Sequence, residues 1–443
     1  MTASEALAQP SSNEVFQNLT NLDRLMTLAQ WIGIGAIVGI LCGTSSALFL
    51  YFLEWATAFR NGHEFIIYAL PVAGLAIGWF YERFGRSIEG GNNLIIDTIH
   101  DEGPEIPTRM APMVFFGSVL THLFGGSAGR EGVAVQMGAG LADGLSHRLK
   151  LTPKIRKQIL AAGVAGGFGS IFGTPIAGAI FGMEFITLGS MAYGALVPAL
   201  AASVVGDMTT RALGIHHTVF PAPMHLALTP LMLFKWLMFA VAMAATSIVF
   251  IELTHRLKMA AEKHAVRLPI RMFIGGVLLI GLWKIVGTSD YLGLGVPGIV
   301  RAFQDPQLPM YAFAAKLIFT VVTLGAGYPG GEVTPLFFIG ASLGNVMARM
   351  LGVPIDLCAG IGMAAVFAAS ANTPLALSIM SMELLGAPMF PHVVIVCVLA
   401  YLLSGHRSIY SSQRMVHSKG GSRLKESTAL RDLGEKKRRG TWE

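Results

Sequence analysis

The sequence contains little charge: 13% of its 443 residues are Asp, Glu, Lys or Arg, against roughly 25% in a typical soluble domain. It contains only three cysteines, which lie in apolar runs without disulfide or metal spacing, and we interpret them as buried apolar residues. Hydrophobic residues make up 53% of the chain, and the mean hydropathy is +0.59. These values exclude a disordered chain and argue against a soluble globular enzyme, so we predict a surface that faces lipid.

Long uncharged runs support a membrane location. Residues 25–53, 158–183 and 357–382 form runs of 29, 26 and 26 residues without Asp, Glu, Lys or Arg, and about 20 apolar residues span a bilayer as a helix. The first run lies too deep in the chain, and lacks the small-residue cleavage site, to be a signal peptide. Each run therefore predicts helix within the membrane.

Other apolar stretches are too short to cross, and Gly or Pro interrupts several, for example at Gly173-Thr174-Pro175. Broken helices at membrane depth are tolerated where the freed backbone groups line a cavity or are buried in protein, and they mark transport sites. We therefore predict an all-α polytopic membrane protein with many tilted, broken and re-entrant helices.

The chain also repeats itself. Two pairs of segments match in the same order, at offsets of 199 and about 202 residues. Chance similarity of Gly-rich apolar segments is the alternative to duplication. We predict two inverted-topology repeats, roughly 25–206 and 230–405, with a site at their interface. The matched segments are GTPIAGAIFGMEF (173–185) with NTPLALSIMSMEL (372–384), and GGSAGREGVAVQMG (125–138) with GYPGGEVTPLFFIG (327–340).

Basic residues are concentrated at the end of the chain. Residues 406–443 hold ten Lys and Arg against four Asp and Glu, a net charge of +6 that equals that of the whole chain. The positive-inside rule places this tail in the cytoplasm. We interpret it as a disordered end, with binding to anionic lipid headgroups as the alternative. Nucleic-acid binding is not expected because no aromatic platform accompanies the tail.

The predicted organisation has three parts. A cytoplasmic N-terminal segment covers 1–24, a transmembrane transport domain covers 25–405, and the end of the last helix with the basic cytoplasmic tail covers 406–443. Two internal basic loops, 147–157 and 255–271, are also predicted to be cytoplasmic.

Three Gly-rich turns lead into predicted helices. Small residues leave N–H groups free at a helix start, and such starts bind anions. Three starts that converge would form a pocket of positive potential within a medium of low dielectric constant. The turns are Gly90-Gly91-Asn92-Asn93-Leu94, Gly129-Arg130-Glu131-Gly132-Val133 and Gly330-Gly331-Glu332-Val333-Thr334-Pro335.

Four carboxylates lie in or beside apolar runs, where an ionisable group is costly and implies function, pairing or capping. Glu131 and Glu332 lie beside the predicted anion turns, where a carboxylate can compete with the anion or protonate and move aside, which would couple protons to anions. Glu184 and Glu383 occupy equivalent places in the repeat, which favours a structural role for both.

Several short patterns suggest enzymes but lack the necessary context. Residues 293–298 fit G-x-G-x-x-G without a β-α-β unit. Residues 125–129 fit G-x-S-x-G without a preceding strand or triad partners. His63-Glu64 is not followed by the second His of a zinc protease motif. We therefore predict no enzymatic activity, no cofactor and no metal site.

The three turns resemble the anion-cradling motifs of the CLC family of anion channels and anion/proton antiporters, which are of the types GSGIP, GREGP and GGxFxP. Ile409-Tyr410-Ser411 is similar to the family's terminal tyrosine motif. The resemblance covers roughly 25–415, and only the GREG motif is close to verbatim.

Departures from the motifs resemble the fluoride-exporting branch of the family. Asn92 stands in place of the family's Ser, Val133 in place of a Pro, and Val333 in place of an aromatic residue within GGEVTP. The second, inward-side Glu of the chloride antiporters is absent, because Glu184 is followed by Phe185.

The resemblance implies a homodimer with one pathway per subunit that exchanges fluoride for protons, with lipid as its surroundings. It implies a multi-pass protein of the cell membrane, here the bacterial inner membrane. A chloride channel or chloride/proton exchanger is the alternative. The implied gating and proton-coupling residues are Glu131 and Glu332, and the implied anion contacts are Asn92, Gly129, Arg130, Gly132, Val133, Val333, Thr334 and Tyr410.

Overall fold

The computed structural model describes residues 21–100, 105–223, 226–264, 266–421 and 423–433. Most of the predicted N-terminal segment and the last ten residues of the basic tail therefore lie outside the described residues. Helices dominate the remainder, as predicted. Five of them are long and apolar enough to cross a membrane: Asp23–Gly62, Glu64–Phe84, Pro230–Lys263, Leu268–Val286 and Val333–Leu351.

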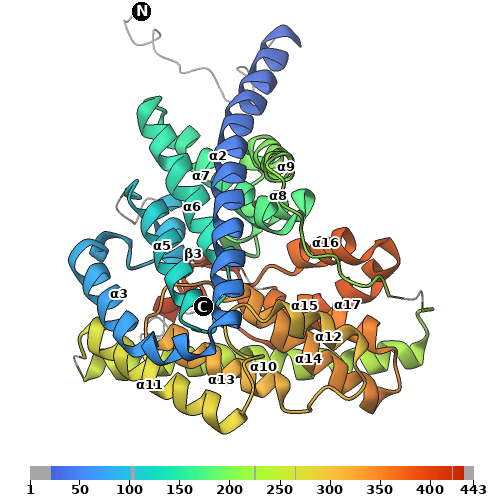
Figure 1. The fold of residues 1–443 in the computed structure, drawn as a ribbon. Coiled ribbons are helices and arrows are strands. Elements are labelled where there is room, and N and C mark those ends of the chain that lie inside the picture. The colour runs from blue at the N-terminus through green and yellow to red at the C-terminus, as the bar shows by residue number, and fades with distance from the viewer. Residues whose placement is uncertain (1–20, 101–104, 224–225, 265, 422, 434–443) are drawn as a thin grey trace, which may run out of the picture.

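The described α-helices form two sets of eight that correspond in order (Figure 1). The first set is α2 (Asn21–Gly62), α3 (Leu70–Phe84), α4 (Asn92–Ile99), α5 (Met110–Leu123), α6 (Glu131–Arg148), α7 (Pro153–Phe172), α8 (Pro175–Glu184) and α9 (Leu196–Ala212). The second set is α10 (Pro230–Lys263), α11 (Leu268–Val286), α12 (Val296–Gln304), α13 (Ala312–Gly325), α14 (Val333–Leu351), α15 (Ile355–Ala371), α16 (Pro374–Leu385) and α17 (Phe390–Leu403). Five short 3₁₀ turns complete the helical elements: η1 (Glu64–Ala69), η2 (Arg86–Ile88), η3 (Tyr193–Ala195), η4 (Ala387–Met389) and η5 (Leu430–Asp432).

Equivalent contacts recur in the two sets. The hydroxyls of Ser46 and Ser170 lie 2.7 Å apart, and those of Ser247 and Ser370, some 200 positions later, lie 2.9 Å apart. Glycines pack α6 against α7 and α14 against α15, because a Cβ at Gly340 would collide with the Gly362 carbonyl. Small residues that let backbones approach this closely are typical of membrane helix packing. The predicted two-repeat, all-α fold is confirmed.

The break predicted at Gly173-Thr174-Pro175 separates α7 from α8. Gly173 ends α7 in a left-handed conformation with φ of 75°, and Asn372 ends α15 in the same way with φ of 58°. Gly and Asn are the residues that tolerate this conformation best. In both repeats a Thr-Pro pair then starts the next helix, because Pro is suited to a first helical turn.

Glu184 and Glu383 join the two repeats reciprocally. The carboxylate of Glu184 accepts hydrogen bonds from the amides of Leu375 (3.1 Å) and Ala376 (2.8 Å) at the start of α16. Glu383 accepts them from Ile176 (3.0 Å) and Ala177 (2.8 Å) at the start of α8. A carboxylate at a helix N-terminus satisfies orphan donors and the helix dipole. These contacts carry the structural role that the repeat positions indicate.

Glu184→Ala is expected to destabilise the protein without changing what it transports. The substitution leaves the amides of Leu375 and Ala376 without their acceptor, and each buried orphaned donor costs about 1–3 kcal/mol. We expect a clear fall in the thermal unfolding temperature of the detergent-solubilised protein. Glu184→Gln, which keeps one carbonyl acceptor, should lose less. A wild-type melting temperature in Glu184→Ala would contradict the capping role.

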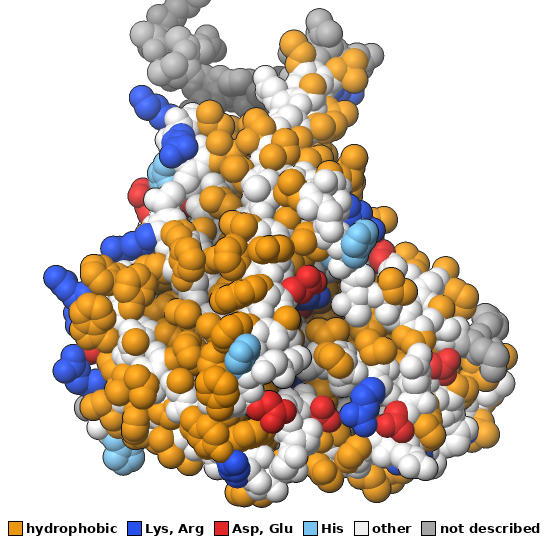
Figure 2. Space-filling model, viewed as in Figure 1, with side chains coloured by type: hydrophobic (Ala, Val, Ile, Leu, Met, Phe, Trp, Pro, Cys, Tyr) orange, Lys and Arg blue, Asp and Glu red, His pale blue; other side chains and the backbone are white. Residues whose placement is uncertain are grey.

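The outer surface suits a lipid environment. Figure 2 shows hydrophobic side chains over most of one face, with charged side chains few and scattered. Large apolar side chains such as Trp79 and Phe234 are about 60% exposed. A soluble monomer rarely exposes an apolar area of this extent.

The basic tail differs from its prediction. Strand β2 (Arg414–His417) pairs in parallel with β1 (Thr187–Leu188), and β3 (Arg423–Ala429) pairs antiparallel with β2. The prediction of a disordered end is therefore wrong for the described part of the tail. Its charge obscured a local apolar pattern, since Met415 packs with Leu188 and Leu433 in a small core of its own.

Candidate anion site

The starts of α6 and α14 meet at the interface between the repeats. The amide of Gly129 donates to the Gly331 carbonyl at 2.6 Å, and the amide of Gly331 donates to the Gly129 carbonyl at 2.8 Å. Both positions require glycine, because a Cβ at Gly331 would lie 2.9 Å from the Gly132 nitrogen and one at Gly129 the same distance from Pro335 Cδ. The sequence predicted two separate turns, and the structure pairs them.

Glu131 is buried, and its carboxylate accepts hydrogen bonds both at the start of α14 and at the start of its own helix. The Thr334 hydroxyl donates to the carboxylate at 2.6–2.7 Å, and the Thr334 amide donates to Oε2 at 3.0 Å. Arg130 adds its amide at 3.2 Å and places Nε 3.4 Å from Oε1. Every contact is a donor to a negative charge, so the carboxylate fills a position suited to an anion.

Asn92 begins α4, directly after Gly91, whose φ of 54° favours glycine. The Asn92 Nδ2 and Glu332 Oε2 atoms both face Gly132, since each would lie 3.3 Å from a Cβ added there. The Asn92 Oδ1 is buried and has no hydrogen-bond partner among the described residues. In this assigned orientation the donor end of the Asn92 amide lies near Gly132, as does the Glu332 carboxylate.

The start of α4 also lies against α6, because a Cβ at Gly91 would be 3.3 Å from the Gln136 amide nitrogen. The three turns singled out from the sequence therefore belong to neighbouring helix starts. Val133 and Val333, within the first turns of α6 and α14, are both buried and contribute backbone rather than side-chain polarity.

Tyr410 lies near the two carboxylates of the site. It is buried and lies within electrostatic range of the Glu332 and Glu131 carboxylates. Its ring packs edge-on against Phe185, with ring centroids 4.9 Å apart. Phe185 was considered from the sequence only as the place of a missing Glu, and its role as a support for Tyr410 had no sequence signal.

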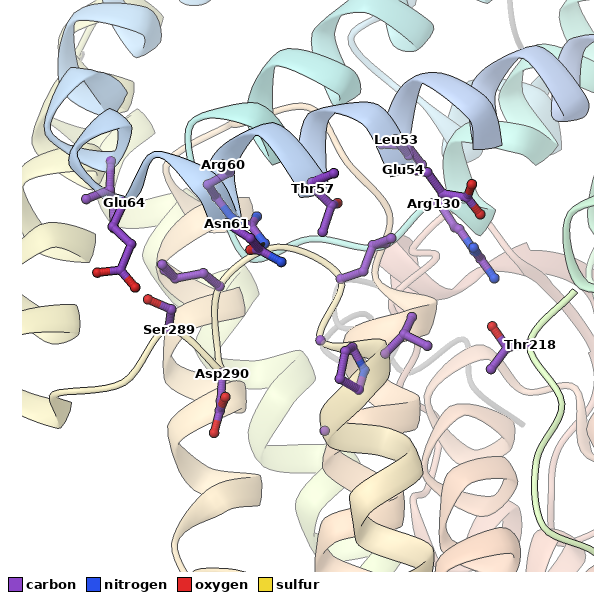
Figure 3. A pocket seen from close by; sticks show the side chains of 18 of the residues that line it. Leu53, Glu54, Thr57, Arg60, Asn61, Glu64, Arg130, Thr218, Ser289 and Asp290 are labelled. Carbon is purple, nitrogen blue, oxygen red and sulfur yellow. Dashed lines mark hydrogen bonds between the residues drawn. The ribbon is translucent and has the colours of Figure 1, made fainter. Parts of the chain in front are cut away.

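A cavity of about 620 Å³ opens beside the site (Figure 3). Its lining includes Arg60, Glu54, Asp290 and the Arg130 side chain, which points across the gap towards Thr218. A smaller cavity of about 20 Å³ shares Arg130 and Thr218 and is also lined by Glu131 and Thr334. Glu131 therefore lines the smaller cavity, which shares Arg130 and Thr218 with the wide one.

This arrangement brings hydroxyl, amide and backbone donors together with the carboxylates of Glu131 and Glu332, and donors of these kinds can replace the water shell of an anion. Among the described residues, no group of three or more His, Cys, Asp or Glu side chains is arranged to hold a metal ion.

Comparison with known proteins identifies similar membrane anion channels. Residues 73–405 match the family model described as voltage gated chloride channel. A Pseudomonas syringae pv. tomato protein named chloride/fluoride channel protein is 44% identical over 429 residues, which cover 94% of each chain. A voltage-gated ClC-type chloride channel of Salmonella typhi is 25% identical over 422 residues, covering 87% of this chain and 99% of that protein.

Solved structures are similar as well. A CLC-type fluoride/proton antiporter superposes with a TM-score of 0.85 at 34% identity, covering 90% of this chain and all of that one. A slow cyanobacterial chloride/proton antiporter superposes with a TM-score of 0.73 at 18% identity, covering 85% of this chain and 94% of that one. The second likeness bears on the fold alone.

Proposed function

Because the chain belongs to the voltage-gated chloride channel family of membrane anion channels and antiporters, we propose that it is an antiporter that exports fluoride in exchange for protons. The main observation behind the proposal is that the Glu131 carboxylate accepts the hydrogen bonds of the Thr334 amide and hydroxyl at the start of α14. A titratable group that fills an anion position must leave before an anion takes its place. Protonation lowers the cost of leaving, and so links the two ions.

The donor set favours fluoride. Fluoride is small and strongly hydrated, and a dry site must replace its water shell with short, strong donors. The Thr334 hydroxyl, the Asn92 amide and the Tyr410 hydroxyl are donors of this kind. A protonated Glu131 adds a fourth, through a short O–H contact to the anion. The similarity to a solved fluoride/proton antiporter supports the same assignment.

The exchange runs through residues on both sides of Glu131. Fluoride enters from the cytoplasm past Tyr410 and Asn92 while Glu131 holds the Thr334 donors. Protonation of Glu131 from the wide cavity releases those donors to fluoride, which leaves through the cavity lined by Arg130. Glu131 returns as an anion after passing its proton inward by way of Glu332, whose carboxylate faces Gly132 in the first turn of α6.

The alternative is a chloride channel or chloride/proton exchanger of the same fold, and the name of the Pseudomonas relative includes both anions. Efflux from liposomes loaded with equal fluoride and chloride distinguishes the two functions. We expect fluoride to leave much faster than chloride. Equal or faster chloride efflux would favour the alternative.

The proposal extends to the oligomeric state and the cellular location of the protein. We infer a homodimer with one pathway per subunit, in the inner membrane of a bacterium, with the described part of the tail on the cytoplasmic side. The protein acts without enzymatic activity or cofactor, and its partners are fluoride, protons and membrane lipid.

Asn92→Ser is expected to weaken the preference for fluoride over chloride, by roughly tenfold, which corresponds to about 1.4 kcal/mol. Asn92 directs a rigid amide donor at the site, whereas serine has a shorter side chain that leaves more room for a larger anion. The liposome efflux ratio measures the change. If the variant keeps the full fluoride preference, Asn92 does not select the anion, and Tyr410 or the backbone does.

A further inference from the structure

A turn at residues 410–413 links Tyr410 to the core through a fully buried glutamine. Gln413 donates to the carbonyls of Phe185 (2.9 Å) and Ala371 (2.7 Å). Its Oε1 accepts hydrogen bonds from the Asn372 amide (3.0 Å) and the Ser408 hydroxyl (2.7 Å). A buried amide with its donors and acceptor satisfied holds the segment rigidly. One end of the turn is therefore fixed to the end of α8 in the first repeat and to the break between α15 and α16 in the second.

The same turn is attached to the helix that carries Asn92. The Ser412 amide donates to Asn93 Oδ1 at 3.0 Å, and the Ser412 hydroxyl donates to Asp97 Oδ2 at 3.0 Å. Asn93 directly follows Asn92, and Ser412 lies two positions after Tyr410. The separation between the Asn92 amide and the Tyr410 ring thus depends on contacts between their neighbours.

Arg431 fastens these contacts from the end of the C-terminal hairpin. Its guanidinium donates to both Asp97 oxygens, at 3.0 and 3.2 Å, and to the Ser412 hydroxyl at 2.9 Å. Its backbone amide donates to the Ser411 carbonyl at 2.9 Å. A planar guanidinium that pairs with both oxygens of a carboxylate fixes the orientation of the two side chains as well as the distance between them. Strands β2 and β3 carry the chain back so that Arg431 reaches this place.

We propose that Arg431 is a positioning residue that sets the distance between Asn92 and Tyr410, and through it the size of anion that the site accepts. The inference deepens the proposed function and rests on it. Fluoride needs short contacts to both donors at once, whereas the larger chloride ion tolerates a wider gap. A loosened turn therefore weakens fluoride binding more than chloride binding.

Arg431→Ala tests the proposal in the full-length protein reconstituted in liposomes. We expect the ratio of fluoride to chloride efflux to fall by roughly tenfold, which corresponds to a loss of about 1.4 kcal/mol in the preference for fluoride. Asp97→Asn, which keeps an acceptor for Ser412 but loses the charge pair, should lower the ratio as well. Asp97→Asn therefore tests the same proposal if Arg431→Ala does not fold.

Arg267→Ala is the matched control. Arg267 makes an equivalent forked pair with Glu82, at 3.2 and 3.0 Å, and is exposed. Its loss should leave the ratio unchanged. Slower efflux of both anions at the wild-type ratio in Arg431→Ala and Asp97→Asn would overturn the proposal, because it would mean a purely structural role. Wild-type liposomes that release no fluoride would instead overturn the proposed function.

Discussion

Glu131→Gln is expected to abolish proton movement driven by a fluoride gradient. The variant should also show slow or no fluoride flux, because a neutral amide cannot alternate between an anion mimic and a protonated acid. Both carboxylate oxygens of Glu131 receive only donors, from Thr334 and Arg130. In Glu131→Gln the NH₂ group of the amide would face one of these donors, and a donor cannot accept a hydrogen bond. The variant therefore loses hydrogen bonds to a charged group, which are worth about 1.5–3 kcal/mol each. Internal pH and fluoride efflux are recorded on the same liposomes.

Glu184→Gln is the matched control for this variant. Glu184 is a buried glutamate that also accepts two backbone hydrogen bonds at a helix start. It lies at the junction with α16 rather than in the lining of the smaller cavity. Coupled transport should survive in Glu184→Gln. Proton movement at the wild-type rate in Glu131→Gln would remove the gating role and the mechanism that depends on it.

Glu332→Ala is expected to slow or uncouple proton-linked transport, with proton flux reduced by at least about tenfold, while the protein stays folded. Glu332 faces Gly132 beside Asn92 and lies within electrostatic range of Glu131 and Tyr410. By the family resemblance, Phe185 takes the place of the inward-side Glu of the chloride antiporters, and we propose that Glu332 carries the proton inward instead. The ratio of protons to fluoride moved measures the coupling.

Glu383→Gln provides the comparison, since its carboxylate accepts hydrogen bonds from Ile176 and Ala177 across the repeat interface. It should keep wild-type coupling with reduced thermal stability. Wild-type coupled flux in Glu332→Ala would reduce Glu332 to a cap on the start of α14.

Local signals in the sequence were sufficient for most of the helices and for the choice of candidate site residues, whose roles stay predictions. The uncharged runs, the Thr-Pro restart after Gly173, and the Gly-rich turns predicted helices, a break and candidate anion positions because each depends on nearby residues. The matching restart after Asn372 was noted only as part of the repeat. The matched positions of Glu184 and Glu383 also indicated a structural role before their hydrogen bonds were known.

Contacts between distant segments were not predictable in the same way. The sequence placed Glu131 near the N–H groups of its own turn, whereas its carboxylate reaches Thr334, 203 positions away. The approach depends on the pairing of Gly129 with Gly331 across the repeats. Strand β1 is only two residues long, and so it gave no pattern that would have ordered the tail. Arg431 was counted simply as one of ten basic residues.

The most direct measurement of the central claim is proton movement against a pH gradient, driven by fluoride, in liposomes that contain the wild-type protein and whose membrane potential is clamped. An inward proton current should follow outward fluoride flow, at a fixed ratio, and should be absent in protein-free and Glu131→Gln liposomes. Those controls remove the contribution of undissociated hydrogen fluoride that crosses lipid by itself. Fluoride efflux with no protein-dependent proton movement would contradict the account and identify the protein as a channel.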